Sequence, residues 1–225
     1  MLFNTLLILH IAAGFTALIT ALVAIFSKVI DVAHKWHVYS GQIYFWAMFV
    51  IFVTAIPMSI LQPNLFLFLI AIFSFYFALT GWRTAKNRRG TPQIIDWAKA
   101  VIMSATGLIM MLYGTYMLIH GSLNGVILIV FGLLGTTSGY RDLKTLLAGG
   151  LRGKARIAEH LSSMMGATIA TLTAFLNNNI RIEPEIIVWL GPTVLITPLI
   201  FWWNRQLRAG RRVTGMETPA LVEQS

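Results

Sequence analysis

The chain contains no cysteine, and charged residues make up only 11% of its 225 positions. The lack of cysteine excludes disulfide bonds, thiolate nucleophiles and thiolate metal sites. A soluble domain carries about a quarter of charged residues, and a chain of this size still exposes a large surface. Low charge combined with 57% hydrophobic residues therefore predicts that much of this surface faces lipid rather than water.

The sequence also lacks the alternation of apolar and polar residues that a membrane β-barrel requires. It holds instead seven continuous apolar runs, close to the roughly 17–25 residues that a helix needs to cross a bilayer. Lipid offers the backbone no hydrogen bonds, so each run is expected to be a helix. The runs lie at 4–26, 39–61, 65–82, 98–119, 124–140, 158–177 and 186–204. We predict an all-α, multi-pass membrane protein with seven transmembrane helices.

Acidic residues are scarce, with 8 Asp and Glu against 17 Lys and Arg. The basic residues follow the first, third, fifth and seventh runs, whereas the opposite links contain only Arg181. Because basic loops stay in the cytoplasm, we predict an outer N-terminus and an inner C-terminus. The transmembrane domain then covers 1–204, and a basic, then disordered, cytoplasmic tail covers 205–225. Basic loops lying on anionic lipid headgroups account for the positive charge without nucleic acid as a partner.

Short repeated patterns indicate how the helices are paired. The third run ends in TGWRT at 80–84 and the fifth in SGYRD at 138–142, and a basic linker follows each. We interpret this as three helical hairpins followed by a seventh helix, with chance similarity among apolar helices as the alternative. Glycines recur every seven residues, at 107 and 114 in the fourth run and at 125, 132 and 139 in the fifth. Such spacing aligns them on one face and predicts close helix contact.

Histidines inside the predicted spans are the clearest functional candidates, because ionisable groups are costly in a membrane. Depth sorts four of them into an outer pair, His10 with His120, and an inner pair, His37 with His160. Two imidazoles from different helices at one depth commonly hold haem b. Our first hypothesis is therefore an electron carrier with these four histidines as haem ligands and a quinone as partner. The alternative is that the histidines make interhelical hydrogen bonds.

Two other interpretations stay open. One is an intramembrane metal-dependent hydrolase, with carboxylate and imidazole ligands at Asp31, His34, His37, Glu159 and His160. The other is a protein that transports or senses a small lipophilic ligand without a cofactor. Its pocket would be lined by aromatic residues, namely Tyr44, Trp46, Tyr113 and Tyr116. Trp46, about two turns into its run, is expected to pack inside the bundle, and the pattern shows no inward Arg–Asp couple.

Three short motifs carry a family resemblance, mainly within residues 5–90. They are His10-x-x-x-Gly14, His37-x-x-x-Gly41-x-x-Tyr44 and the basic Gly-Trp-Arg loop that begins at Gly81. This part of the chain resembles the uncharacterised bacterial multipass proteins of the DUF2306-like type. Val38 departs from their pattern, in which an Arg often follows the second histidine. The resemblance implies a protein of the bacterial cytoplasmic membrane, and it implies no substrate and no catalytic residue.

Overall fold

The computed structural model describes residues 1–29 and 34–209 of the chain. Within these ranges it contains seven α-helices and no β-strand, which confirms the predicted all-α fold class. The helices are α1 (Leu2–Val29), α2 (His34–Leu61), α3 (Leu65–Lys86), α4 (Ile94–Ile119), α5 (Asn124–Leu147), α6 (Gly153–Asn179) and α7 (Ile186–Arg208). The shortest has 22 residues and the longest 28. At 1.5 Å per residue they measure about 33 to 42 Å.

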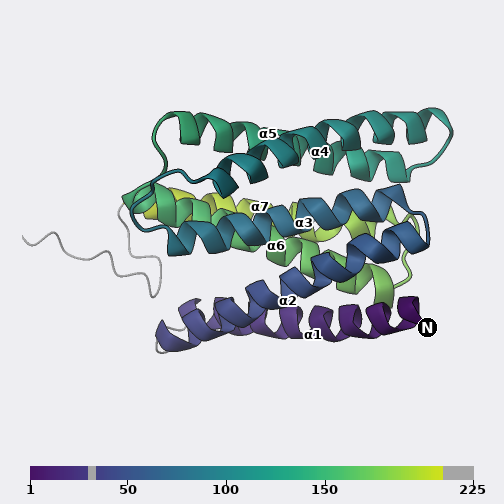
Figure 1. Ribbon diagram of the computed structural model, residues 1–225, viewed down its shortest axis with the longest axis horizontal. Coiled ribbons are helices and arrows are strands. Elements are labelled where there is room, and N and C mark those ends of the chain that lie inside the picture. Colours follow the sequence, from purple (N-terminus) through teal and green to yellow (C-terminus); the bar gives the residue numbers. More distant parts are fainter. Residues whose placement is uncertain (30–33, 210–225) are drawn as a thin grey trace, which may run out of the picture.

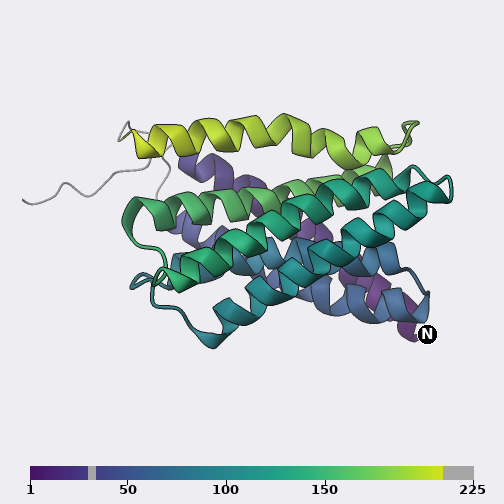
Figure 2. The ribbon, with the colours of Figure 1, turned by 90° about the horizontal axis from the view of Figure 1, so that it is seen from above.

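The helices form three layers (Figure 1). Helices α1 and α2 make one outer layer, α4 and α5 make the other, and α3, α6 and α7 lie between them. All seven run along the long axis of the bundle, and Figure 2 shows α7 along one side of it. The N-terminus and the links before α3, α5 and α7 therefore gather at one end. The basic links before α4 and α6 gather at the other, which we call the basic end.

The ends of the helices agree with the predicted apolar runs on one side of the bundle only. Away from the basic end, observed and predicted limits coincide at residues 61, 65, 119, 124 and 186. At the basic end the helices are longer than predicted, since α5 continues to Leu147 rather than 140 and α6 begins at Gly153 rather than 158. A charged side chain ends an apolar run, but a helix can continue while long side chains reach water.

Six of the seven helices, α1 to α5 and α7, are long and apolar enough to cross a membrane. The chain is thus a multi-pass membrane protein whose apolar helices suit contact with the lipid bilayer. Helix α6 was also predicted to span, but its composition is more polar. It packs against α3, α7 and α1 and buries Ser163, Thr171 and Thr173. A helix that other helices shield from lipid needs less apolar surface of its own.

Glycine contacts join α4 to α5, which the predicted arrangement assigned to different hairpins. A Cβ atom added at Gly132 would lie 2.7 Å from the carbonyl oxygen of Gly107, and one at Gly114 would lie 2.6 Å from that of Gly125. The predicted glycine face is therefore confirmed. Of the predicted hairpins, the first is observed, since α1 packs against α2. The other two are not, because α3 packs mainly against α6 and α5 does not pack against α6.

Two clusters of buried side chains fill the bundle. One lies between α3, α4, α5 and α7 and includes Phe73, Met103 and Trp189. The other lies between α1, α2, α3 and α6, and its small members are Ala17, Ala21, Ala47, Ala78 and Ala167, packed around Tyr44 and Met48. Trp46 was expected in this interior, but its side chain is 57% exposed. It occupies the opposite face of α2 from Tyr44 and Met48, so the expectation was wrong.

Candidate functional site

His37 on α2 and His160 on α6 meet near the basic end of the bundle. Their ring centroids lie 6.2 Å apart with the ring planes at 85°. His37 Nδ1 lies 3.0 Å from the carbonyl oxygen of Ala24 on α1, and His160 Nδ1 lies 2.8 Å from that of Gly81 on α3. Four helices thus contribute to one site, and the predicted inner pair is brought together.

The two hydrogen bonds determine which ring nitrogens are free. A carbonyl oxygen can only accept, so Nδ1 of each ring must donate. In a neutral imidazole the lone pair then lies on Nε2. Histidines that bind metals are held in this way, with one ring N–H donated to a carbonyl or carboxylate and the other nitrogen facing the ion. Both rings therefore present Nε2 as a base or a ligand.

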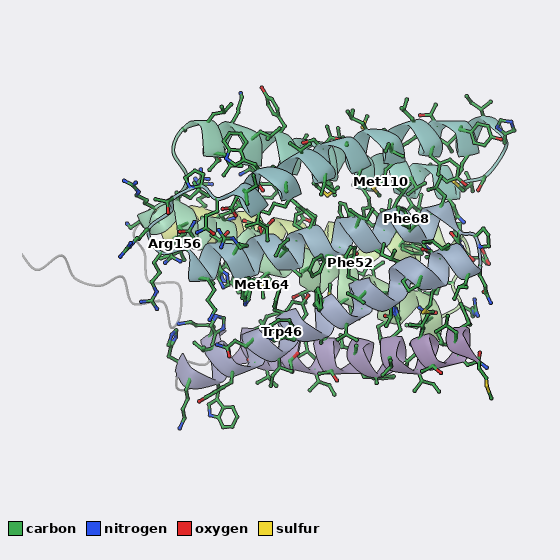
Figure 3. All side chains as sticks on the ribbon, in the orientation of Figure 1. Trp46, Phe52, Phe68, Met110, Arg156 and Met164 are labelled. Carbon is green, nitrogen blue, oxygen red and sulfur yellow. The ribbon has the colours of Figure 1, made fainter. Side chains whose placement is uncertain are left out.

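Gly81 is the residue that brings α3 and α6 close enough for this contact. A Cβ atom at that position would lie 2.5 Å from the Sδ atom of Met164 and 3.2 Å from its backbone nitrogen. Figure 3 shows Met164 beside α3, on the helix that carries His160. The absence of a side chain at Gly81 lets its carbonyl accept from His160, so the local backbone packing positions the imidazole.

Two cationic side chains lie near the pair, Lys28 on the side of His37 and Arg156 on the side of His160. Arg156 is anchored by hydrogen bonds from Nη1 to the carbonyl oxygens of Thr84 at 2.8 Å and Ala85 at 3.3 Å. Figure 3 places Arg156 at the end of the bundle where nitrogen-bearing side chains gather. An anionic group bound next to the two imidazoles would find cations there.

The predicted outer pair, His10 and His120, is not brought together. His10 Nδ1 lies 2.9 Å from Thr54 Oγ1 across the α1–α2 contact. That hydroxyl gives its own proton to α2 carbonyls, so His10 donates to it. His120 is exposed after the end of α4 and bonds the carbonyl oxygen of Tyr116 at 2.8 Å. Helices α1 and α4 belong to opposite outer layers, which corrects the sequence-based pairing by depth alone.

The proposed ligands of a metal hydrolase do not form a complete set in the described part of the chain. There, no group of three or more His, Asp or Glu side chains is arranged to hold a metal ion. Asp31 lies outside the described residues. His34 is exposed, with its ring centroid 6.2 Å from that of His37. Glu159 instead accepts a hydrogen bond from Ser163 at 2.9 Å.

A network of buried ion pairs near the basic end was not predicted. The Asp142 carboxylate on α5 pairs with the Lys99 ammonium on α4 and accepts from the Tyr76 hydroxyl on α3 at 2.9 Å. Arg83 on α3 binds both oxygens of Asp96 on α4, at 3.1 and 2.8 Å. The sequence alone had not singled out this Arg–Asp couple. Each pair joins different helices, so periodicity along one helix could not reveal it.

These charged side chains line a small cavity of about 60 Å³. Thr80 also faces it, and its buried Oγ1 has no hydrogen-bond partner among the described residues. A sequence signal for the network did exist. Asp96 and Asp142 are isolated acids within strongly basic segments at the ends of apolar runs, where an acid requires a cationic partner.

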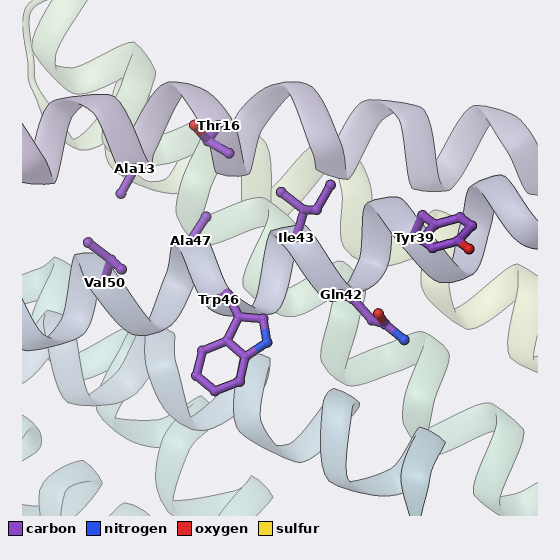
Figure 4. Close-up of a pocket in the computed structure, with 8 residues that line it drawn as sticks. All are labelled: Ala13, Thr16, Tyr39, Gln42, Ile43, Trp46, Ala47 and Val50. Carbon is purple, nitrogen blue, oxygen red and sulfur yellow. The ribbon is translucent and has the colours of Figure 1, made fainter.

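The four aromatic residues predicted to line one pocket are separated. Tyr44 is buried between α1, α2, α3 and α6 and bonds Thr171 Oγ1 at 3.2 Å. Tyr113 and Tyr116 stack on α4 with centroids 6.2 Å apart. Trp46 lines a groove of about 450 Å³ between α1 and α2 (Figure 4). The groove residues are Ala13, Thr16, Tyr39, Gln42, Ile43, Trp46, Ala47 and Val50.

Comparison with known proteins adds no relative to this description. The chain matches no protein-family model, no curated protein and no solved structure. The resemblance to the DUF2306-like proteins therefore stays a prediction, and the functional argument depends on the geometry of the site.

Proposed function

We propose that the protein is an electron carrier of the bacterial cytoplasmic membrane that holds one b-type haem between His37 and His160. In this proposal α6 spans the membrane with the other six helices. The N-terminus is outside and the basic end is cytoplasmic, in line with the distribution of Lys and Arg.

The observation that carries the proposal is that two imidazoles from different helices meet inside the bundle. The ring centroids of His37 and His160 are 6.2 Å apart, so both rings could hold one group. Their Nδ1 atoms are already engaged with carbonyl groups, as ligating histidines require.

The surroundings suit a haem in two further respects. The adjacent interior includes small side chains beside Tyr44 and Met48, with Ala17, Ala78 and Ala167 fully buried. Small residues on facing helices would let a planar group enter with less displacement of side chains than bulky residues would. Lys28 and Arg156 supply positive charge at the basic end, where the propionates of a haem would need it.

The residues of the chain have separable tasks in this mechanism. His37 and His160 would hold the group through their Nε2 atoms, and the carbonyls of Ala24 and Gly81 orient the imidazoles and increase their basicity. A b-type haem supplies one-electron chemistry when bound. The proposal involves one centre, because the helices of His10 and His120 are not in contact.

The first experiment is an absorption spectrum of the detergent-purified protein, expressed with ample haem, before and after dithionite. A Soret band that sharpens on reduction, with α and β bands of b-type haem, is expected. His37→Ala and His160→Ala should each remove it. His34→Ala and His120→Ala are matched controls and should retain it. A colourless wild-type protein under these conditions would refute the haem.

A second candidate function is the binding of a lipophilic molecule for transport or sensing, without a cofactor. The groove between α1 and α2 favours it, because about 450 Å³ lies within the range of roughly 300–1,000 Å³ typical of ligand pockets. If the purified protein is colourless but still binds a lipophilic probe, this second function is supported over the electron carrier.

A further inference from the structure

The groove between α1 and α2 contains polar side chains that have no partner. Gln42 and Tyr39 lie on its α2 side, and both are exposed. Among the described residues, neither the Gln42 amide nor the Tyr39 hydroxyl makes a hydrogen bond within the protein. Gln42 lies about one turn inside the predicted apolar run 39–61, and an amide in hydrocarbon without a partner is unfavourable. A molecule in the membrane is therefore expected to bond it.

The rest of the groove is apolar. Ala13 of α1 faces α2, whose Ala47 and Val50 point toward α1 (Figure 4). Trp46 adds an indole ring, 57% exposed, one turn from Gln42. The groove therefore combines a polar part near the start of α2 with an aromatic surface and an apolar floor deeper in the helix pair. A ligand with a flat polar head and an apolar tail would match this order, with its head at the polar part of the groove and its tail along the apolar floor.

The polar part selects the chemistry of the head. The Tyr39 hydroxyl and the NH₂ group of Gln42 are both donors. The Thr16 hydroxyl is already used, since it donates to the carbonyl of Ala12 at 2.9 Å. Two unused donors suit a head that carries carbonyl acceptors. We propose that the groove binds a quinone, with ring carbonyls near Gln42 and Tyr39, the ring beside Trp46 and the tail over Ala47 and Val50.

The choice of a quinone rests on the proposed electron-carrier function, whereas the hydrogen-bond argument does not. Gln42 is five residues from His37 on the same helix. His37 points into the bundle, and the groove lies on the lipid-facing side of α2. Electrons would thus have to cross one helix between quinone and histidine pair, and the quinone could enter from the bilayer without opening the bundle.

The test is tryptophan fluorescence of the purified protein in phosphatidylcholine nanodiscs, titrated with decylubiquinone. Saturable quenching is expected, and Trp46→Phe should reduce its amplitude. Gln42→Leu should raise the half-quenching concentration by about five- to tenfold. Thr115→Val, an exposed polar-to-apolar change on α4, is the matched control and should leave the titration unchanged. Thr16→Phe should fill the groove and abolish saturation, while Leu195→Phe on exposed α7 surface should not.

Several outcomes would overturn the proposal. Unchanged titrations for both Gln42→Leu and Thr16→Phe would do so. Displacement of the quinone by an added phospholipid without a quenching group, seen as recovery of the fluorescence, would identify the occupant as ordinary lipid. Conversion of a dimer to a monomer by Thr16→Phe, with quenching unaffected, would identify it as a second copy of the chain.

The same titration on His37→Ala separates this proposal from the haem. Loss of the haem spectrum with quinone quenching retained is the result expected if both proposals hold. Quenching without haem in the wild type would refute the haem alone, and haem without saturable quenching would refute the groove alone.

Discussion

His160 donates from Nδ1 to the carbonyl oxygen of Gly81 at 2.8 Å, so an imidazole of α6 is held by the backbone of α3. This bond lies at a close contact between α3 and α6. Gly81 tolerates the approach because it has no Cβ atom to meet Met164. The position of the His160 imidazole therefore depends on the packing of Gly81 against Met164, although neither of these residues carries a reactive group.

Gly81→Ala should disturb both packing and site. The new methyl group would meet the Met164 side chain and backbone, and α6 would have to move away from α3. Overpacking of this kind lowers the free energy of unfolding by about 1–3 kcal/mol. SDS titration in detergent micelles measures it, and the haem spectrum should weaken in parallel.

Gly41→Ala is the matched control for that variant. Gly41 is also a helical glycine of the same helix bundle, but nothing lies within 4 Å of an added Cβ atom. Alanine has a helix propensity about 1 kcal/mol better than that of glycine, so this variant should be neutral or more stable. Equal losses for Gly81→Ala and Gly41→Ala would contradict the packing argument.

His10→Leu should destabilise the protein by about 1 kcal/mol, the value of one interhelical hydrogen bond. His10 donates to Thr54 at 2.9 Å between α1 and α2. His34→Leu, at an exposed position, should have little effect. SDS titration measures the free energy of unfolding of both variants. Equal values for the two would contradict the role of His10 in joining α1 to α2.

The helices themselves could be predicted from apolar length, because a lipid-facing backbone has only one way to satisfy its hydrogen bonds. Away from the basic end the predicted limits are within two residues of the observed ones, and they coincide at residues such as 119 and 124. The extension of α5 to Leu147 could not be predicted, since Arg141 and Asp142 end the apolar run but not the helix.

Which helices pair could be predicted only where small residues mark the contact. Gly107 and Gly132 indicated the α4–α5 contact, and they are in contact. The α3–α6 contact joins residues about eighty positions apart, and a single glycine marks it on α3. Chain order predicts the contact of α1 with α2, but it does not reveal that α6 packs against α3 rather than α5.

For the candidate site, the position of each histidine along its span correctly placed His37 and His160 at the same end of the bundle. Position along a span cannot show which helices are neighbours. The same criterion paired His10 with His120, whose helices lie in opposite layers. The Lys99–Asp142 pair was missed because its members are 43 positions apart and neither helix alone shows it.

Asp142→Asn should be strongly destabilising. It leaves the Lys99 ammonium, whose side chain is only 8% exposed, without its carboxylate. Removing one member of a buried pair costs about 3–5 kcal/mol, whereas replacing both by apolar residues is often neutral. The double variant Lys99→Met with Asp142→Leu should therefore recover most of the loss in SDS titration.

Lys144→Met is the control for the charge change. Lys144 is exposed at the same end of α5, with Nζ 4.8 Å from the ring centroid of Tyr140. Its removal should alter the free energy of unfolding by less than about 0.5 kcal/mol. If the double variant were no more stable than Asp142→Asn, the loss would come from the missing carboxylate's other partner, the Tyr76 hydroxyl.

The proposed orientation can be tested directly, because the chain has no cysteine and each introduced cysteine is the only one. Gln62 lies in the exposed link between α2 and α3, and Ala148 lies exposed after α5 at the basic end. In intact cells a membrane-impermeant maleimide should label Gln62→Cys and not Ala148→Cys, which should react only after permeabilisation. The opposite pattern would place the basic end outside, against the positive-inside rule, and would put the His37–His160 pair on the outer side of the membrane.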